Sequence, residues 1–402
     1  MSRFHHYDPE QAYLLPPSVK DLLGERHLAF HVHKLIEAMD VQEFEQAYAA
    51  EGRLAYPPRM MLKVWLYAFC VRVTSTRKLE QRIREDIGFR YLAGGLTPDH
   101  KTLSEFLRRH RFALNTLFTH VLEQARGAGL VRLGHVAIDS TRVQASASRW
   151  RVRGEEDQRR HRLALRKQVR EFQRKASEQD PDHGEGGLVM SGEEQAALEK
   201  TVEQMPRALP TLNKSAAQES TTDPDARFLR APKGWVLGYT ADVAVSDDHF
   251  IVAARVTQNA NDNASLLPML ELVQQQCGSL PEKLTADCGF FSGQALAQLS
   301  ALGVDAYVPD SNVVREFNTG VPAAGLGRSP IRNPHHQRMR AKLRSPDGRR
   351  IYGRRQAVVE PVFGVLKEQR GINKFRRRGL ANVAIEWLLA VTAYNTTRLA
   401  RY

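Results

Sequence analysis

Apolar residues recur with the period of an α-helix through the first third of the chain. The segment 57–73 opens with two prolines, which suit a first helical turn, and continues with a broad apolar face. A charged amphipathic segment follows at 74–88, and a third long helical segment runs over 97–129 until glycine stops it. Residues 1–130 are therefore predicted to form a helical N-terminal domain.

The third of these segments carries Arg108, Arg109 and Arg111 close together. Short helices joined by short polar turns, with basic residues on one of them, are typical of helix-turn-helix DNA-binding units. A helical bundle with solvated arginines explains the same pattern, so both interpretations stay open here.

The pattern changes to that of β-strands at about residue 133. The stretch 133–148 is rich in β-branched residues around Asp139, and two more strand-like runs from residue 233 flank a polar turn, as in a hairpin. Helix and strand patterns then alternate to residue 310. The order predicts an α/β domain over residues 131–402, with a mixed five-stranded sheet flanked by helices.

Two polar stretches interrupt this scheme. Residues 149–225 begin as a basic helix and continue as a loop-like run, and strands resume after them, so they are predicted to be an insertion within the domain. Residues 310–350 are basic and are expected to form a loop before the last helices.

Composition narrows the class of protein. With 42% hydrophobic and 26% charged residues among 402, the chain has the balance of a soluble globular protein. It has neither an apolar run long enough to cross a membrane nor a signal-peptide pattern at its start, so the cytoplasm is the expected compartment. Its three cysteines are an odd number without CxxC spacing, which argues against a disulfide framework or a zinc knuckle.

The positive charge is concentrated in one part of the chain. The formal net charge is +13, and residues 328–402 alone hold 18 Lys or Arg against 4 Asp or Glu. Such a one-sided distribution favours a polyanionic partner, and nucleic acid is the natural one.

Three acidic residues stand out by their positions. Asp139 lies in the first predicted strand and Asp287 at the end of the fourth. Glu360 precedes Pro361 and an apolar helical pattern, which predicts a place near a helix N-terminus, where the helix dipole favours an ionised carboxylate. Lys367 follows Glu360 by seven residues, two turns along the same face.

Three carboxylates from separate elements suit one kind of chemistry. Hydrolysis or transfer at a phosphodiester uses two divalent cations about 4 Å apart, and Mg²⁺ prefers carboxylate oxygens as ligands. A lone acid at such a position is more often a turn or cap residue. The chain also holds rival acids: Asp242, Asp247, Asp248 and Asp262.

The whole set of motifs resembles the DDE transposases of bacterial insertion sequences, whose catalytic domain has an RNase H-like fold. The resemblance is carried by HVAIDSTRVQASAS, STTDPDARFLR, GWVLGYTADVAV, VTQNANDNASLLPML, LTADCGFFSG and VVEPVFGVLKEQRG, and by YPPRMMLKVWLYAF in the N-terminal part. It implies that Asp139, Asp287 and Glu360 are the catalytic, metal-binding triad.

The family pattern also places a tyrosine and an arginine before the glutamate and a lysine after it. Lys367 fits its position, whereas Tyr352 and Arg355 keep their mutual spacing but lie one residue too far from Glu360. The DNA-binding candidates are Lys367, Arg355, Arg376, Arg377, Arg378, Arg108 and Arg109.

The resemblance implies an activity, cofactors and partners. The expected reaction is metal-dependent cleavage at the ends of an insertion element and strand transfer into target DNA, with two Mg²⁺ ions or Mn²⁺ in their place. The expected partners are double-stranded DNA, as terminal inverted repeats and target, and further copies of the chain in a dimer or larger assembly at the bacterial nucleoid. An RNase H-like nuclease that never joins strands and a non-catalytic DNA-binding repressor derived from a transposase remain as alternatives.

Overall fold

The computed structural model describes residues 18–48, 54–154, 218–231, 234–320 and 333–402, with a few isolated positions between 160 and 171. Most of the predicted insertion at 149–225 therefore lies outside the described residues. The N-terminal part is helical, as predicted. Its elements are η1 Val19–Leu22, α1 Leu28–Glu37, α2 Gln42–Glu45, α3 Pro58–Cys70, α4 Thr76–Glu85, α5 Ile87–Ala93, α6 His100–Arg109 and α7 Leu114–Gly127.

The segment predicted as one helix over 97–129 is two helices, α6 and α7, so that prediction was wrong. Asp99 caps α6 by accepting a hydrogen bond from the Thr102 backbone N–H at 2.7 Å. His110, only 2% exposed, ends the helix and forms a 3.1 Å hydrogen bond with the Tyr48 hydroxyl. This buried contact fixes a turn at a point where the apolar periodicity alone shows no break.

The five predicted strands are present and form a mixed sheet. They are β1 His135–Gln144, β5 Gly234–Ser246, β6 Ile251–Thr257, β7 Lys283–Ala286 and β8 Asp305–Tyr307. The strand order is β4-β5-β1-β7-β8, and β6 pairs with β5; β7 and β8 run parallel to β1 while β5 runs antiparallel.

The sheet has one strand more than predicted. Strand β4, Arg227–Ala231, pairs with the first part of the long strand β5, and β6 pairs with its later part. A separate two-stranded ribbon joins β2, Val152–Gly154, to β3, Gln218–Ser220. The ribbon lies at the two ends of the predicted insertion and β4 directly follows it, and the polar composition there concealed all three strands.

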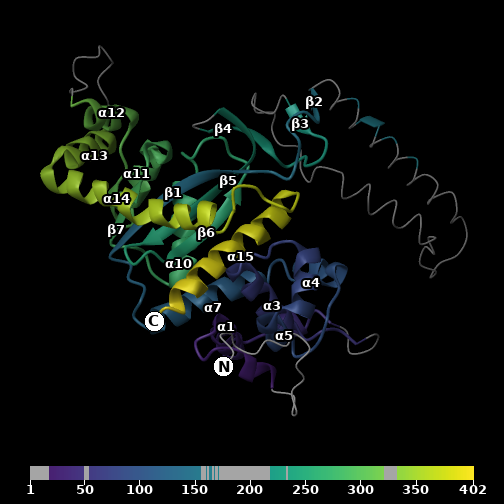
Figure 1. The fold of residues 1–402 in the computed structure, drawn as a ribbon. Coiled ribbons are helices and arrows are strands. Elements are labelled where there is room, and N and C mark those ends of the chain that lie inside the picture. The colour runs from purple at the N-terminus through teal and green to yellow at the C-terminus, as the bar shows by residue number, and fades with distance from the viewer. Residues whose placement is uncertain are drawn as a thin grey trace, which may run out of the picture.

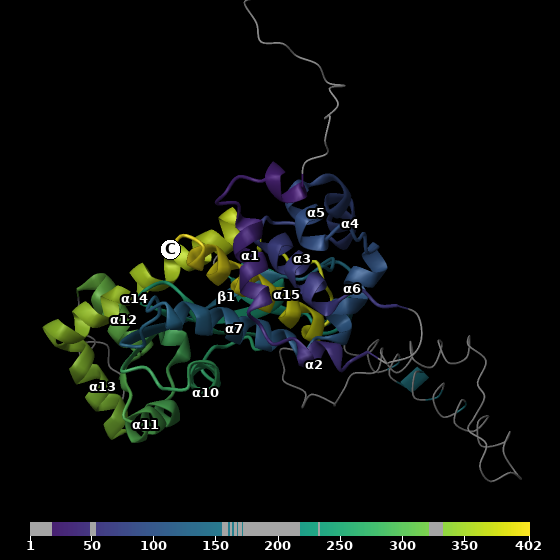
Figure 2. The ribbon, with the colours of Figure 1, turned by 90° about the horizontal axis from the view of Figure 1, so that it is seen from below.

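Helices cover both faces of the sheet (Figures 1 and 2). Helix α10, Leu266–Cys277, packs against β5 and β6, and α14, Pro346–Gly364, lies across β1 and β7 on the opposite face. Helix α11, Gly293–Ala301, follows β7. The sheet thus presents one strand-end region under α14, where the candidate acids lie.

The last helix, α15 Leu380–Leu399, joins the sheet to the N-terminal helices (Figure 1). It packs against β6 on one side and against α3 and α7 on the other. Asn395 covers the outer edge of β6 by bonding both the N–H and the C=O of Ile251, at 3.0 and 2.8 Å. Buried apolar residues form one continuous cluster from the N-terminal helices to α15, so the proposed boundary near residue 130 stays a prediction.

The basic stretch 310–350, predicted as a loop, is largely helical, and that prediction was wrong. It contains α12, Ser311–Thr319, and α13, Pro334–Arg344. Both helices start at strong caps: Asp310 accepts hydrogen bonds from two backbone N–H groups of α12, and Asn333 accepts two from α13. Proline at the first position of α13 suits a helix start, as it does elsewhere in the chain.

Asp310 also holds α12 against α13. Its carboxylate accepts a 2.6 Å hydrogen bond from Arg340 Nε and pairs with His336. Burial acts to raise the pKa of Asp310, but these hydrogen bonds outweigh it and bring the pKa to about 2. The ionised side chain therefore stabilises the folded state.

Asp310→Asn is expected to lower the free energy of unfolding by about 2 kcal/mol at pH 7. Because the folded-state pKa is depressed, the contribution is present above the ordinary pKa of 3.8 and is lost as the pH falls towards 2. Urea unfolding from pH 7 to pH 3 measures it. Asp347→Asn, which removes only an exposed pair with Arg350, is the matched control. A difference from wild type that stays constant over this pH range would contradict the assignment.

Candidate active site

The register of two parallel strands brings Asp139 and Asp287 together. In this register Ile138 of β1 lies opposite Ala286 of β7. Asp139 follows Ile138 and Asp287 follows Ala286. The two side chains therefore leave the same face of neighbouring strands, whose backbones lie about 5 Å apart. The expectation that these two acids converge at one end of the sheet is met by this geometry.

Backbone and side-chain donors orient both carboxylates. Asp139 accepts a hydrogen bond from the Ser140 N–H at 2.8 Å, and Asp287 accepts one from the Cys288 N–H at 2.7 Å. Arg355 of α14 donates from Nη1 to Asp139 Oδ2 at 2.8 Å, and its Nη2 lies 4.0 Å from Asp287 Oδ1. One guanidinium therefore bridges the pair.

Burial differs between the two acids and changes their electrostatics. The Asp139 side chain is 21% exposed and that of Asp287 is 42% exposed. Burial raises the pKa of Asp139 to about 6, against the opposing effect of Arg355, and the charge of Asp287 adds to the rise. A carboxylate that is costly to ionise without a cation is a suitable ligand for one.

Lys367 lies close enough to this site for the charge of Asp139 to act on it. Burial lowers the pKa of its half-buried amine, while the negative charges of Glu368 and Asp139 act to raise it. Lys367 lies in η5, Val365–Gln369, a π-helical turn that continues α14. Such turns occur frequently at functional sites.

Glu360 does not lie at a helix N-terminus, so that prediction was wrong. Helix α14 begins at Pro346, with Ser345 as its cap, and Glu360 is deep within it. The physical reason is that Ser345 and Pro346 together form a better start than Glu360 and Pro361. Pro361 is instead tolerated inside the helix at the loss of one backbone hydrogen bond.

Glu360 is exposed and lies apart from the two aspartates. Among the described residues, which include all three acids, no group of three or more His, Cys, Asp or Glu side chains is placed to hold one metal ion. Yet Arg355 and Lys367 both interact with Asp139 and lie on either side of Glu360 in the sequence. The segment that carries Glu360 therefore borders the site at both ends.

The site fits a hard divalent cation only in part, because two of the three candidate carboxylates lie together. Asp139 and Asp287 offer oxygens on rigid strand ends, as Mg²⁺ requires, and the remaining ligands can be water and phosphate. The third acid is not in place in this conformation. The two aspartates thus fit metal binding, whereas Glu360 does not join them in this structure.

The four rival acids are all engaged in other ion pairs. Asp242 pairs with Arg255, Asp248 with Arg132, and Asp262 with Arg142, at 3.0, 2.8 and 3.0 Å. Asp247 pairs with both His135 and Arg354. Their positions on or beside the same strands are explained by these pairs. Asp139 also forms an ion pair, but its partner Arg355 reaches a second strand-end acid, Asp287, as well.

Gly289, two residues after Asp287, has a close side-chain neighbour. Its backbone is not in the left-handed region, so no sharp turn requires glycine there. A Cβ at this position would instead meet Asp262 Oδ2 at 3.2 Å. Asp262, which pairs with Arg142, thus packs against the backbone two residues after Asp287. Phe290 is buried, and the partly exposed Phe291 lies against the His336 ring at an interplanar angle of 50°.

The turn that carries Arg376, Arg377 and Arg378 is tied down by acids. Buried Glu386 accepts hydrogen bonds from the backbone N–H groups of Arg376 and Arg377 at 2.9–3.0 Å. Asp223 accepts another from Gly379, whose φ of 80° favours glycine. STTDPDARFLR therefore supplies a structural clamp, a role that no spacing in the sequence indicated.

The predicted DNA-binding arginines differ in how available they are. The guanidinium of Arg377 lies over the Trp65 ring and is largely buried, whereas Arg376 and Arg378 are exposed. Arg108 forms a two-pronged pair with Glu105, and Arg109 lies over the Tyr48 ring. Arg108, Arg109, Arg376 and Arg378 are thus exposed, and Arg377 is the least accessible of these candidates.

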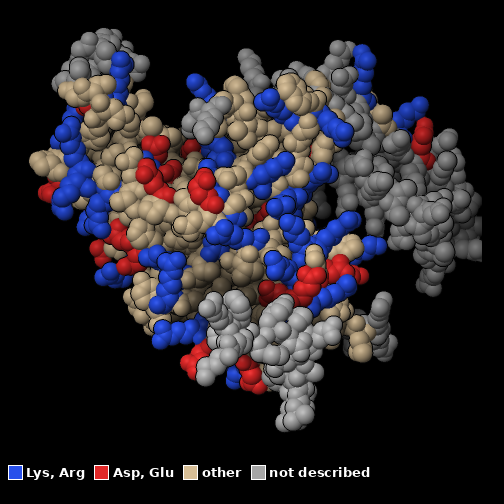
Figure 3. All heavy atoms as spheres, in the orientation of Figure 1, with Lys and Arg blue, Asp and Glu red and all other residues tan. Residues whose placement is uncertain are grey.

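Lys and Arg side chains crowd the face that holds α14 and α15 (Figure 3). Red acidic atoms form a small group among them, and blue atoms spread on several sides. This distribution suits a polyanion that lies across the two helices. Among the described residues, no helix has both the length and the apolar character needed to span a bilayer.

Comparison with known families agrees with the geometry. Residues 17–109 match a family described as Transposase domain (DUF772), and residues 216–396 match one described as Transposase DDE domain. No curated protein and no solved structure matches the chain. The second match includes Asp287 and Glu360 but begins after Asp139.

A helical N-terminal part followed by a mixed sheet with helices on both faces is the architecture of the RNase H-like DDE enzymes. Together with the two matched domains, it defines the class. The chain belongs to the DDE transposases of insertion sequences.

Proposed function

We propose that the protein cleaves DNA at the ends of an insertion element and transfers the freed strand into target DNA. The observation that carries this proposal is the pair Asp139 and Asp287, oriented by backbone N–H groups and bridged by Arg355. The family membership supports DNA as the substrate. Both element ends must be held at once, so the working form is proposed to be a dimer or larger.

The proposed site residues form two groups, one that would bind the metal and one that would bind DNA. Asp139 and Asp287 would hold Mg²⁺, with Glu360 as the third acid, and the bound ions would activate the attacking oxygen and stabilise the leaving oxygen. Lys367 would contact a phosphate beside the bond that breaks. Arg376 and Arg378 would bind the backbone, which adds affinity but no sequence specificity.

The reaction is proposed in two in-line displacements. Water attacks the phosphodiester at the element end and leaves a free 3′ hydroxyl. That hydroxyl then attacks a phosphodiester of the target, so one bond forms as another breaks. Arg355, between the two aspartates, supplies positive charge that keeps their carboxylates adjacent.

The test is to incubate the protein and Mg²⁺ with labelled DNA that carries the element's own ends, together with a supercoiled target plasmid. Nicking followed by covalent joining of the label to the plasmid is expected. Nicking without joining, from uncleaved or precut ends, would favour a nuclease. Salt-sensitive DNA binding without any cleavage would favour a repressor.

A further inference from the structure

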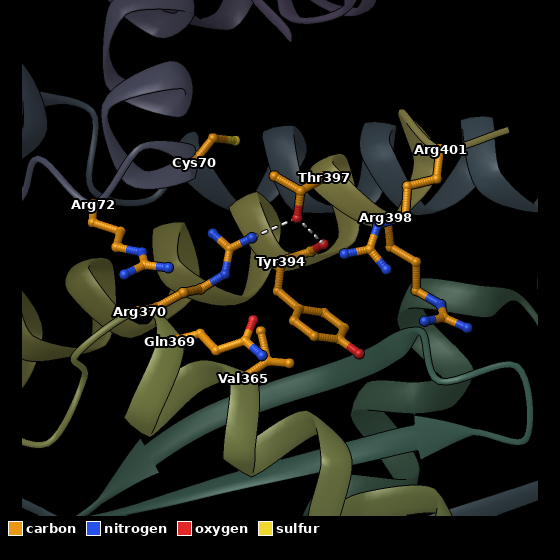
Figure 4. A pocket seen from close by; sticks show the side chains of 9 residues that line it. All are labelled: Cys70, Arg72, Val365, Gln369, Arg370, Tyr394, Thr397, Arg398 and Arg401. Carbon is orange, nitrogen blue, oxygen red and sulfur yellow. Dashed lines mark hydrogen bonds between the residues drawn. The ribbon is translucent and has the colours of Figure 1, made fainter.

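An arginine-lined cavity lies where the end of α3, η5 and α15 meet (Figure 4). Its volume is about 180 Å³, whereas a single water needs roughly 10–15 Å³ of such space. The cavity has room for a group of several heavy atoms. Its lining residues are Cys70, Arg72, Val365, Gln369, Arg370, Tyr394, Thr397, Arg398 and Arg401.

The lining contains four arginines and, within the described chain, no acid. The two other titratable groups do not compensate, because burial raises the pKa of Cys70 to about 12 and also raises that of Tyr394. Both groups are therefore neutral near pH 7. Nothing in the lining balances the positive charge, so an anion would lower the energy of the site.

Arg370 is a fixed and only partly satisfied donor. Its Nη1 donates to the Phe69 carbonyl and its Nη2 to the Ala393 carbonyl, each at 3.2 Å, and to the Thr397 hydroxyl. Its Nε is buried without a partner among the described residues. Burial lowers its pKa, and the charge of Arg72 lowers it further. A buried guanidinium that faces like charges needs an anionic partner.

The other arginines surround it. Arg398 is held by a 2.8 Å hydrogen bond from its Nε to the Asp248 carbonyl. Arg72 and Arg401 are exposed and lie on opposite sides of the cavity, with their guanidinium groups turned towards Arg370 and Tyr394 (Figure 4). Arg72 has a φ of 66°, a backbone conformation that is rare outside glycine and is associated with functional positions.

We propose that this cavity binds a phosphate group. Guanidinium forks match the oxygens of a phosphate, and donors from several directions suit its tetrahedral shape. The DNA backbone is one source of that phosphate, and this part rests on the proposed function. A free phosphate ion or nucleotide is the other.

The position of the cavity favours DNA as the source of the bound phosphate. Arg72 lies in the turn after α3 and Arg401 in the turn after α15. Arg370 follows η5, which carries Lys367, a residue on which the charge of Asp139 acts. A backbone phosphate in the cavity would hold the strand against both parts of the chain, near the candidate active site.

The test uses the double variant Arg72→Gln/Arg401→Gln. It removes two charges and leaves Arg370 and Arg398, which bind backbone carbonyls, in place. Arg90→Gln/Arg126→Gln, which removes two exposed arginines from α5 and α7, is the matched control. All proteins are measured at the same ionic strength, with chloride replacing phosphate where needed.

Inorganic phosphate is expected to raise the Tm of wild type and control by a few degrees but not that of the double variant. With a 30-bp duplex as probe, the slope of log Kobs against log salt concentration should shrink by about 0.9 in the double variant alone. If the double variant loses both the rise in Tm with phosphate and part of the salt dependence of DNA binding, the cavity binds a DNA phosphate. If it loses only the rise in Tm, the cavity binds a free phosphate or nucleotide.

A double variant that matches wild type in both measurements overturns the proposal. So does a control that loses as much as the double variant, because the effect would then be one of overall charge. If the wild type fails to bind DNA, the proposed function fails, and the Tm measurement with phosphate still decides whether the cavity binds an anion.

Discussion

Asp139→Asn is expected to lower metal-dependent DNA cleavage at least about a hundredfold, the equivalent of roughly 3 kcal/mol in the transition state. The amide has no negative charge to hold Mg²⁺, and the remaining Asp287 is a single ligand on its side of the sheet. Asp287→Asn is expected to show a loss of the same order. Nicking of supercoiled plasmid, followed over time with increasing Mg²⁺, measures both.

Loss of the fold would not explain this result. Asp139 accepts hydrogen bonds on both oxygens, from Ser140 N–H and Arg355, and an asparagine can keep one of them. The expected cost is about 1 kcal/mol of stability. DNA binding depends on lysines and arginines elsewhere and should keep its affinity and salt dependence.

Asp347→Asn is the control for this pair, since that exposed acid at the start of α14 forms only an i,i+3 pair. Its cleavage rate should equal that of wild type. An Asp139→Asn protein that cleaves at the wild-type rate would remove Asp139 from the proposed site.

The sheet and the aspartate pair could be predicted because both depend on short-range patterns. Alternating β-branched residues mark β1, β5 and β6, and a strand that ends in a polar residue marks Asp287. Once two strands are parallel neighbours, acids at matching positions must meet. The N-terminal helices were predictable for the same reason, from the apolar period of segments such as Pro58–Cys70.

The errors arose where a tertiary contact or a cap outweighs the local pattern. His110 breaks a helix through a buried contact with Tyr48, and Asp310 with Asn333 starts two helices in a stretch whose basic composition suggested a loop. The arginine-lined cavity brings together residues from Arg72 to Arg401, which no spacing along the chain relates.

Two predictions were made for Glu360, one from a local sequence pattern and one that a helix cap overturned. Its distance from Lys367 is a local pattern, and the role of both residues at the site stays a prediction. Its predicted place at a helix start was wrong because Ser345 and Pro346 begin α14 fifteen residues earlier. The side chain is exposed and does not join the aspartates, so its part in the chemistry needs a rotation of the side chain or a shift of α14.

Glu360→Gln is expected to abolish cleavage as completely as Asp139→Asn, because two aspartates alone cannot hold both ions that phosphodiester chemistry uses. Its effect on stability should stay within about 0.5 kcal/mol, since no described residue forms an ion pair with this exposed side chain. The substitution thus separates chemistry from folding more cleanly than either aspartate does.

Glu271→Gln is its matched control, an exposed glutamate of α10. Plasmid nicking, urea unfolding and Mg²⁺-dependent DNA binding should be measured on both proteins. A Glu360→Gln protein that is stable, binds DNA and does not cleave means that α14 must bring Glu360 to the aspartates during the reaction. Wild-type cleavage by that protein would mean that Asp139 and Asp287 act without it, in which case the third ligand has to come from another residue.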